Sequence, residues 1–176
     1  VAATAELKMG NGLDEGVQQG PLVNEKAVED VDRLVRLSTD AGAQVALGGA
    51  RSDLGPCYYQ PTVLTGVTSE MAVFRNEIFG PVAPVMSFAD EAEAIALAND
   101  TEFGLASYFY TRDIGRVWRV SEALDYGMVG VNEGIISNEM APFGGVKASG
   151  SGREGSKYGI DDYLEIKYIL MGGLDR

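Results

Sequence analysis

Residues 82–131, VAPVMSFADEAEAIALANDTEFGLASYFYTRDIGRVWRVSEALDYGMVGV, decide the fold, because strand and helix patterns alternate along them over short connections. Strands are predicted over residues 82–88, 106–110 and 128–131. Helices are predicted over residues 90–99 and from Asp113 onward. Strands joined through helices are typical of parallel sheets with right-handed crossovers. The sequence therefore predicts an α/β fold, built on a βαβαβ open parallel sheet with flanking helices.

Both helices of this unit have recognisable start signals. Asp90 with Glu93 three residues later forms a capping-box pattern, and Asp113 opens the second helix. Gly127 is expected to end that helix. Four apolar residues are predicted to share one of its faces: Ile114, Val117, Trp118 and Leu124.

The flanking sequence extends this pattern in both directions. Residues 1–9 read as the tail of a helix, and Asn24 is a plausible N-cap of an amphipathic helix that stops at Gly42. Residues 44–47 and 58–64 predict strands, with Pro61 disfavouring a central position for the second. Residues 164–171 predict a terminal strand. With no internal repeat or boundary in view, residues 1–176 are expected to form a single domain.

Composition excludes several classes of function. The chain of 176 residues has 45% apolar and 23% charged residues, which are ordinary globular values. Its net charge of −12 argues against binding to nucleic acid or to an anionic membrane. No apolar run approaches the roughly 20 residues of a membrane-spanning helix. A cytoplasmic protein without nucleic-acid or membrane partners is expected.

The chain has no histidine and one cysteine, Cys57. A Ser-His-Asp or Cys-His device cannot be assembled from these residues, and neither an internal disulfide nor a Cys-rich zinc site is available. The carboxylates on the predicted helices are expected to form solvated faces and not a metal site. These residues are Glu29, Asp30, Asp32, Glu91 and Glu93.

A glycine-rich stretch, PFGGVKASGSGREGSKYG at residues 142–159, has six glycines in eighteen positions. Such a segment is expected where the backbone turns sharply or approaches another group closely. Residues 150–155 also match the G-x-G-x-x-G dinucleotide pattern, but the lead-in GGVKAS is not the apolar strand that this fingerprint requires. We therefore reject the dinucleotide interpretation.

The glycine-rich stretch as a whole, with Tyr158-Gly159 and Tyr163-x-x-x-Lys167 after it, resembles the C-terminal signature of the aldehyde dehydrogenase superfamily. The block NEIFGPV at residues 76–82 resembles a second motif of that family, in the same order. The sequence of residues 134–139, GIISNE, is most similar to the succinate-semialdehyde dehydrogenase branch. This resemblance covers essentially the whole chain and implies the C-terminal part of the family's catalytic domain.

The NEIFGPV motif implies cofactor-binding roles for Glu77 and Phe79. Taken alone, such a Glu is more often a solvated or capping carboxylate. In the family the matching Glu accepts hydrogen bonds from the nicotinamide ribose hydroxyls, and the matching Phe packs against the nicotinamide. The resemblance therefore implies NAD or NADP as cofactor, without deciding between them.

Three residues further along carry site roles by resemblance. Phe143 matches an aromatic of the substrate channel, against core packing as the alternative. Ser137 matches a Ser that binds the distal carboxylate of the substrate; the alternative is that Ser137 only forms a turn. Glu154 matches a Glu assigned to a proton path; the alternative is that Glu154 forms an ion pair with Arg153 or Lys157. Asn132 is expected to have a structural turn role.

The resemblance places the reactive Cys of the family outside this chain, and Cys57 is interpreted as a buried or half-buried structural residue. In the family, the thiolate attacks the aldehyde, hydride passes to NAD(P)+ and water hydrolyses the thioester. No catalytic residue is therefore assigned here beyond Glu154 as a possible proton relay, and the chain alone is predicted to be inactive.

The intact parent is expected to oxidise succinic semialdehyde to succinate and to form homo-oligomers through the terminal strand, because family members pair this strand with a neighbouring subunit. Two alternatives stay open: a non-catalytic subunit-association module, and a dehydrogenase for a different aldehyde.

Overall fold

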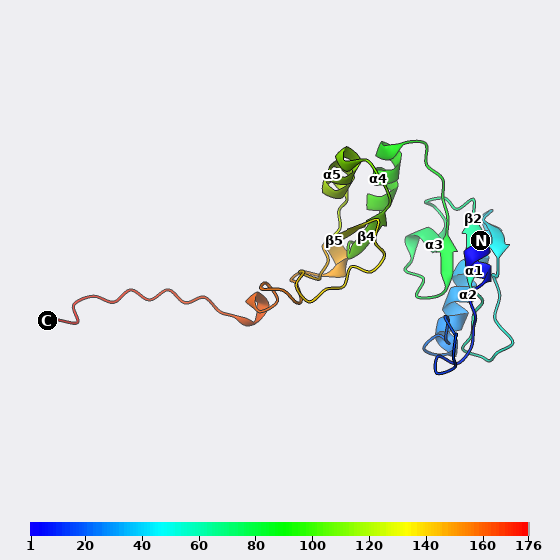
Figure 1. Ribbon diagram of the computed structural model, residues 1–176, viewed down its shortest axis with the longest axis horizontal. Helices are drawn as coiled ribbons and strands as arrows, with labels where there is room; N and C mark the ends of the chain where they lie inside the picture. Colours follow the sequence, from blue (N-terminus) through cyan, green and yellow to red (C-terminus); the bar gives the residue numbers. More distant parts are fainter. Residues whose placement is uncertain (176) are drawn as a thin grey trace. The chain divides into compact units, whose positions relative to one another are not determined.

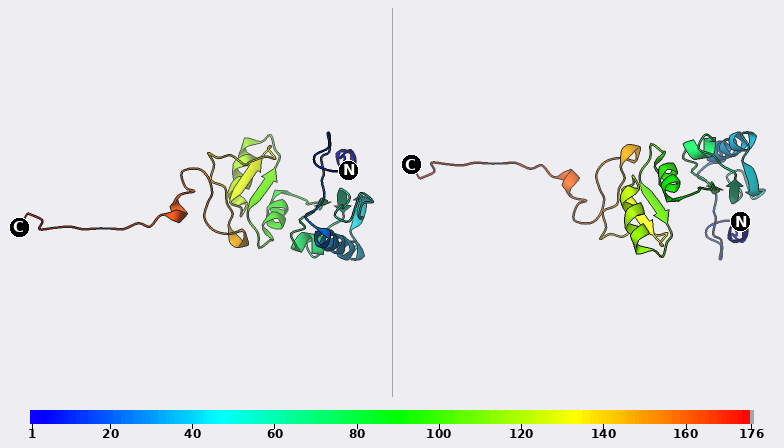
Figure 2. Two further views of the ribbon diagram at one scale, coloured as in Figure 1. Left: turned by 90° about the horizontal axis from the view of Figure 1, so that it is seen from below. Right: turned by 90° about the horizontal axis from the view of Figure 1, so that it is seen from above.

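The computed structural model describes residues 1–175, which divide into two compact units, residues 1–89 and residues 90–175 (Figure 1). Each unit has its own helices and its own sheet, and Figure 2 shows them from two further directions. The expectation of a single domain stays a prediction. In the described part of the chain, none of the helices is both long enough and apolar enough to cross a lipid bilayer.

The first unit is built around a three-stranded sheet in the order β1-β2-β3. Strand β1 (Gln44–Leu47) pairs antiparallel with β2 (Thr62–Thr65), which pairs parallel with β3 (Val82–Pro84). Three helices accompany these strands: α1 (Ala2–Ala5), α2 (Glu25–Asp40) and α3 (Ala72–Arg75). The predicted strand at residues 58–64 therefore becomes β2, and it is the central strand. Pro61 does not interrupt the ladder because β2 begins after it.

Helix α2 forms as its sequence predicts. The Asn24 side chain accepts a hydrogen bond from the Ala27 backbone N–H at 2.9 Å, which satisfies one of the free donors at the helix start. The apolar stripe of α2 is buried in one core together with residues from β2 and the segments around it. The core residues are Val28, Val31, Leu34, Val35, Ala43, Tyr59, Leu64, Val67, Met71 and Val73.

The sequence predicted that Asp32 lies on a solvated face of the helix, and this prediction is wrong. It is only 7% exposed, and its carboxylate pairs with Arg36 at 2.6 Å and with Arg51 at 3.9 Å. The Arg36 pair joins positions i and i+4 of α2. Arg51 comes from the chain beyond β1, so the buried carboxylate ties the helix to this segment.

The second unit contains two parallel strands, β4 (Ala106–Phe109) and β5 (Met128–Val131), paired from Ala106 with Met128 to Phe109 with Val131. Helices α4 (Glu91–Asn99) and α5 (Ile114–Ala123) accompany them, with short 3-10 helices η1 (Lys147–Ser149) and η2 (Asp161–Tyr163). The α/β class, the parallel strand pairs and the flanking helices are confirmed. Strand β3 belongs to the sheet of the first unit, where it pairs with β2, and β4 and β5 form the sheet of the second unit.

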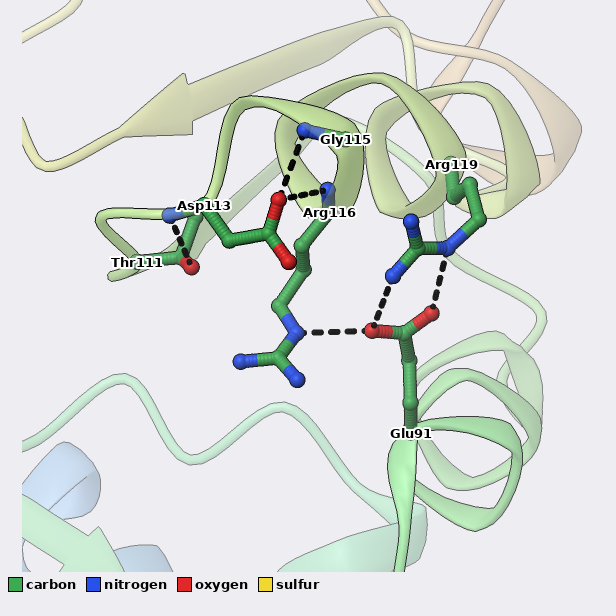
Figure 3. A network of polar contacts seen from close by, with 6 residues as sticks. All are labelled: Glu91, Thr111, Asp113, Gly115, Arg116 and Arg119. Atoms are coloured by element: carbon green, nitrogen blue, oxygen red, sulfur yellow. Dashed lines mark hydrogen bonds and ion pairs between the residues drawn. The ribbon is translucent and has the colours of Figure 1, made fainter.

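The helices of the second unit begin where the sequence predicts. The Asp90 carboxylate accepts from the Glu93 N–H at 2.9 Å, and the Asp113 carboxylate accepts from the N–H groups of Gly115 and Arg116. Glu91 of α4 binds both Arg116 and Arg119 of α5, so the two helices lie side by side (Figure 3).

The predicted apolar face of α5 is only partly buried. Ile114 and Trp118 are 71% and 65% exposed, whereas Val120, outside the predicted set, is buried. The helix also ends at Ala123, before Gly127. Gly127 has a different structural role: a Cβ at this position would collide with the backbone carbonyl of Gly144. The glycine therefore permits the close approach of the glycine-rich stretch.

Residues 164–171 are outside any strand in the described chain, contrary to the sequence prediction of a terminal strand. They run as an extended segment toward the C-terminus in Figure 1, and Ile166 is fully exposed. A strand requires a ladder partner, and within the described residues none pairs with this segment.

Candidate functional site

The NEIFGPV motif leaves α3 and packs directly on α2. Asn76 closes α3, its side-chain amide donating to the Ala72 carbonyl at 2.9 Å. A Cβ at Gly80 would lie 2.5 Å from Cγ2 of the buried Val31, so only glycine permits this approach. Phe79 has a φ of 46°, in the left-handed region, and is 78% exposed. The motif therefore presents an aromatic ring to the surface from an uncommon backbone conformation.

Glu77 and Phe79 line one cavity of about 340 Å³ in the first unit. Its walls come from about two turns of α2 and from the motif itself. The lining residues are Ala27, Asp30, Arg33, Leu34, Asn76, Glu77, Ile78 and Phe79. The structure thus brings the two predicted cofactor-binding residues together. A carboxylate that accepts hydrogen bonds and an exposed aromatic ring fit a sugar carrying a planar base.

Two charged residues of α2, Asp30 and Arg33, border the same cavity. Lys26 donates a hydrogen bond to Asp30 at 2.6 Å, and this ammonium group lowers the pKa of the Asp30 carboxyl. Arg33 lies 3.9 Å from the same carboxylate. Asp30 therefore has its closest charged contact with Lys26 and not with Arg33. The sequence pattern places Arg33 on the polar side of a helix and carries no signal of a binding role.

Phe143 and Glu154 are brought together in the second unit by a backbone bridge. The Phe143 N–H donates to the Glu154 carbonyl at 2.9 Å, and the Glu154 N–H donates to the Phe143 carbonyl at 2.7 Å. Directly paired residues of an antiparallel bridge place their side chains on the same side. Both residues line a cavity of about 530 Å³, whose remaining walls are mostly the glycine-rich stretch.

Arg153 holds this bridge in place. Its guanidinium donates from Nη1 to the carbonyls of Gly145 and Gly152, at 2.8 and 2.6 Å. A Cβ at Gly144 would lie 2.6 Å from the Gly152 carbonyl, so the two sides of the loop meet closely. Within residues 1–175, Glu154 forms no ion pair with Arg153 or Lys157, the alternative considered from the sequence.

Lys147 anchors the glycine-rich stretch at its other end. Its ammonium group donates to the carbonyls of Asn99 and Thr101, at 3.1 and 3.3 Å, and lies 3.7 Å from the Asp125 carboxylate. The residue adopts a φ of 55°, which is uncommon for a side-chain-bearing residue. The G-G-x-K motif contains this Lys, but sequence alone does not indicate that it binds the end of α4.

Asn132 has the structural turn role that the sequence predicts. Its side chain accepts from the Thr111 N–H at 2.8 Å and donates to the Thr111 carbonyl at 2.7 Å. It thereby joins the ends of β4 and β5, and residues 133–141 begin from this point. Ser137, within that segment, is exposed and lines neither cavity. Its predicted contact with substrate stays a prediction.

Cys57 is half-buried, as predicted, and lines neither cavity. Its backbone carbonyl accepts from the Leu22 N–H at 2.8 Å. Among the residues that the structure describes, no three His, Cys, Asp or Glu side chains are grouped so that they could hold a metal ion.

Comparison with known protein families matches residues 1–169 to the aldehyde dehydrogenase family. Among curated proteins, the chain is 58% identical over 175 residues to a mitochondrial succinate-semialdehyde dehydrogenase of Oryza sativa, covering 99% of the chain and 33% of the relative. It is 59% identical to a 3-sulfolactaldehyde dehydrogenase of Pseudomonas putida, with coverages of 99% and 36%. A glutarate-semialdehyde dehydrogenase of Pseudomonas aeruginosa is 58% identical, with coverages of 98% and 36%. The chain thus spans about a third of each relative's length.

Solved structures agree with this grouping. A succinate-semialdehyde dehydrogenase from Burkholderia pseudomallei superposes with a TM-score of 0.93 at 59% identity, covering 96% of this chain and 35% of that one. A betaine aldehyde dehydrogenase from Staphylococcus aureus in complex with NAD+ gives a TM-score of 0.90 at 36% identity, with coverages of 94% and 34%. The α/β fold of this chain therefore matches solved structures of this kind.

Proposed function

This chain belongs to the aldehyde dehydrogenase family, and from that premise we propose that it is the C-terminal part of the catalytic domain of an NAD- or NADP-dependent enzyme. One observation carries the proposal beyond the family: Glu77 and Phe79 line the same cavity. A cofactor with a ribose and a planar ring fits this pair. Relatives support both nucleotides, because one is named as NADP(+)-dependent and another was solved with NAD+.

We infer that the substrate is an aldehyde with an acidic group at its far end. The names of the most similar relatives support this class: succinate semialdehyde and glutarate semialdehyde carry a carboxylate, and 3-sulfolactaldehyde carries a sulfonate. Succinic semialdehyde is our first candidate, oxidised to succinate. The 59% identical sulfolactaldehyde relative favours a different acidic aldehyde as the second candidate.

In this proposal, the residues of the chain bind and orient. The Glu77 carboxylate accepts hydrogen bonds from the ribose hydroxyls, and Phe79 packs against the nicotinamide, which fixes the ring relative to the reacting carbon. The cofactor, when bound, supplies the hydride acceptor. Phe143 lines the substrate channel, and Ser137 binds the distal acidic group of the substrate.

Glu154 is proposed to take up a proton on its carboxylate and pass it away from the site. Its support is the backbone bridge to Phe143, which places both side chains on the same side of the hairpin. The reactive cysteine is proposed to lie elsewhere in the parent protein, because Cys57 lines neither cavity.

The terminal segment is proposed to form a strand with a neighbouring subunit. The support is its exposure: large apolar side chains of residues 164–171 are uncovered, including the fully exposed Ile166. An edge of this kind is a pairing site for another chain. A cytoplasmic location also stays a proposal, and the rice relative is named as mitochondrial.

A chimaera tests the function directly. The chain replaces the matching residues of the Escherichia coli succinate-semialdehyde dehydrogenase, to which it is 58% identical over 170 residues. The purified chimaera is assayed with succinic semialdehyde, glutaric semialdehyde, 3-sulfolactaldehyde and the cationic betaine aldehyde. We expect cofactor reduction with acidic aldehydes and none from the chain by itself.

Three other results would contradict the proposal. A preference for betaine aldehyde would overturn the substrate class. Turnover by the isolated chain that disappears in Cys57→Ala would overturn the assignment of the nucleophile. A chimaera that assembles and binds cofactor but never turns over any aldehyde would favour the subunit-association module.

A further inference from the structure

Arg33 contributes a cationic group to the cavity that Glu77 and Phe79 line. Its side chain is 60% exposed, and the one ion pair it forms with a residue of the described chain is with Asp30, at 3.9 Å. That distance is too long for a hydrogen bond. None of the five guanidinium N–H groups donates a hydrogen bond to another described residue. Arg33 therefore brings unused donors to the cavity wall.

The charges around Arg33 leave it able to attract an anion. Asp30 accepts a hydrogen bond from Lys26 at 2.6 Å, so its charge is compensated on the same helix. Glu77 is the other carboxylate in the lining. The charged residues that line the cavity, Asp30, Glu77 and Arg33, sum to −1, and Lys26, which lies outside the lining, compensates Asp30, whereas the chain as a whole is at −12. The local charge thus does not oppose an anion as the overall charge does.

The cavity wall contains both a carboxylate and a guanidinium group, which bind different parts of a nucleotide. A carboxylate such as that of Glu77 binds sugar hydroxyls, whereas a guanidinium binds phosphate oxygens through paired N–H donors. In a nicotinamide nucleotide, the ribose that carries the ring also carries a phosphate on its 5′ oxygen. A ligand whose ribose lies at Glu77 therefore places a phosphate within the same small part of the molecule.

We propose that Arg33 binds the phosphate attached to the ribose that Glu77 holds, so that α2 supplies a second contact to the cofactor. This inference rests on the proposed role of Glu77. It assigns to α2 a function that its sequence pattern does not indicate. It also explains why a cation on this turn of the helix faces the motif and forms no close ion pair.

The test compares two ligands that differ only in the phosphate: reduced nicotinamide mononucleotide and reduced nicotinamide riboside. Both have an uncharged, fluorescent ring, so their binding to the 176-residue chain is measured by fluorescence titration without any catalytic turnover. We expect the mononucleotide to bind about five- to tenfold more tightly, from a charge-assisted contact at a partly exposed site. Added salt should reduce this preference and leave riboside binding unchanged.

Variants separate the two contacts. Arg33→Gln should remove the preference for the mononucleotide and leave riboside binding as it was, whereas Glu77→Gln should weaken both ligands. Arg112→Gln is the matched control, because it removes one exposed positive charge from the other unit. It should preserve the preference.

The outcomes distinguish the inference from the proposal beneath it. Equal binding of both ligands that still depends on Glu77 would overturn the role of Arg33 and keep the ribose contact. A preference retained in Arg33→Gln would also overturn it. Binding of neither ligand, or binding unaffected by Glu77→Gln, would overturn the ribose site and the Arg33 contact together.

Discussion

Tyr59 shows how one residue links the core to solution pH. Its side chain is fully buried in the core beside α2, and its hydroxyl forms no hydrogen bond with the residues that the structure describes. Burial raises the pKa of Tyr59 to about 12 from an ordinary value of 10.0, and the Asp32 carboxylate adds to the effect. The folded state therefore favours the neutral phenol.

The first residue-scale prediction concerns alkaline stability. Because the unfolded chain releases the Tyr59 proton near pH 10 and the folded chain near pH 12, the free energy of unfolding should fall as pH rises through this window. The expected loss at pH 11.5 is about 2 kcal/mol relative to pH 9. Urea denaturation followed by circular dichroism measures it.

Tyr59→Phe provides the comparison. Since it removes a buried hydroxyl without a partner, the stability at pH 9 should change little or rise slightly. The loss attributed to Tyr59 between pH 9 and pH 11.5 should disappear. An equal loss in Tyr59→Phe and in the natural chain would mean that other groups cause the alkaline sensitivity.

The candidate site was partly predictable at this scale. Glu77 and Phe79 belong to a recognisable motif that ends in Gly80, Pro81 and Val82, so their roles are predicted from sequence resemblance, and the structure places them in one cavity. Arg33 is distant in sequence, and tertiary packing, including that of Gly80 against Val31, brings α2 to the motif. Sequence periodicity identifies the buried side of a helix but does not indicate which loop lies along its edge.

At the scale of elements, a single carboxylate of α4 binds two arginines of α5. Glu91 accepts from Arg119 at 3.0 and 3.2 Å and from Arg116 at 2.7 Å (Figure 3). Hydrogen bonds from Arg119 first, and then from Arg116, lower the pKa of Glu91, while the carboxylate raises the pKa of Arg119. One acidic residue therefore serves two cations one turn apart on α5.

The element-scale prediction follows from the sign of the Glu91 shift. A depressed carboxyl pKa contributes stability above the unfolded pKa, and this contribution is lost as pH falls through the folded pKa. Glu91→Gln should therefore increase hydrogen exchange of α4 and α5 amides at pH 7, with a small effect because the pair is on the surface. At a pH below the folded pKa of Glu91, the variant and the natural chain should exchange alike.

Glu122→Gln is the matched control, because Glu122 is an exposed carboxylate of α5 with no ion pair among the described residues. It should leave exchange unchanged at both pH values. Faster exchange that is equal in both variants would assign the effect to net charge and not to the pair.

Element starts were predictable, while element partners were not. Asn24, Asp90 and Asp113 each cap a helix through a local hydrogen bond, so three or four residues of sequence suffice to locate the start. Strand β3 instead pairs with β2 across the intervening α3, and nothing within residues 82–88 indicates this choice. The exposure of Trp118 was not predicted for the same reason, since the spacing of apolar residues along a helix does not indicate whether another element packs on them.

At the scale of the whole molecule, residues 164–171 are unlike the rest of the chain. Exposed apolar residues elsewhere are interspersed with buried ones, whereas here Ile166, Ile169 and Leu170 are 100%, 66% and 81% exposed and every residue of the segment is exposed. The sequence predicted a strand here, and the described chain has no partner for it. A partner from a second subunit would satisfy both observations.

The last prediction uses this complete exposure. Ile166 has no packing to lose within its own chain, so Ile166→Lys should leave the thermal midpoint of the isolated chain unchanged. In the chimaera, the same substitution places a charge in the proposed subunit contact and should raise the dissociation constant of the oligomer by about tenfold or more. Analytical ultracentrifugation over a range of concentrations measures that constant. Lys167→Gln, one residue away, should leave assembly intact, because its side chain would point to the opposite face of the strand. An oligomer unaffected by Ile166→Lys would place the subunit contact elsewhere, whereas equal loss in both variants would indicate that charge and not strand pairing governs assembly.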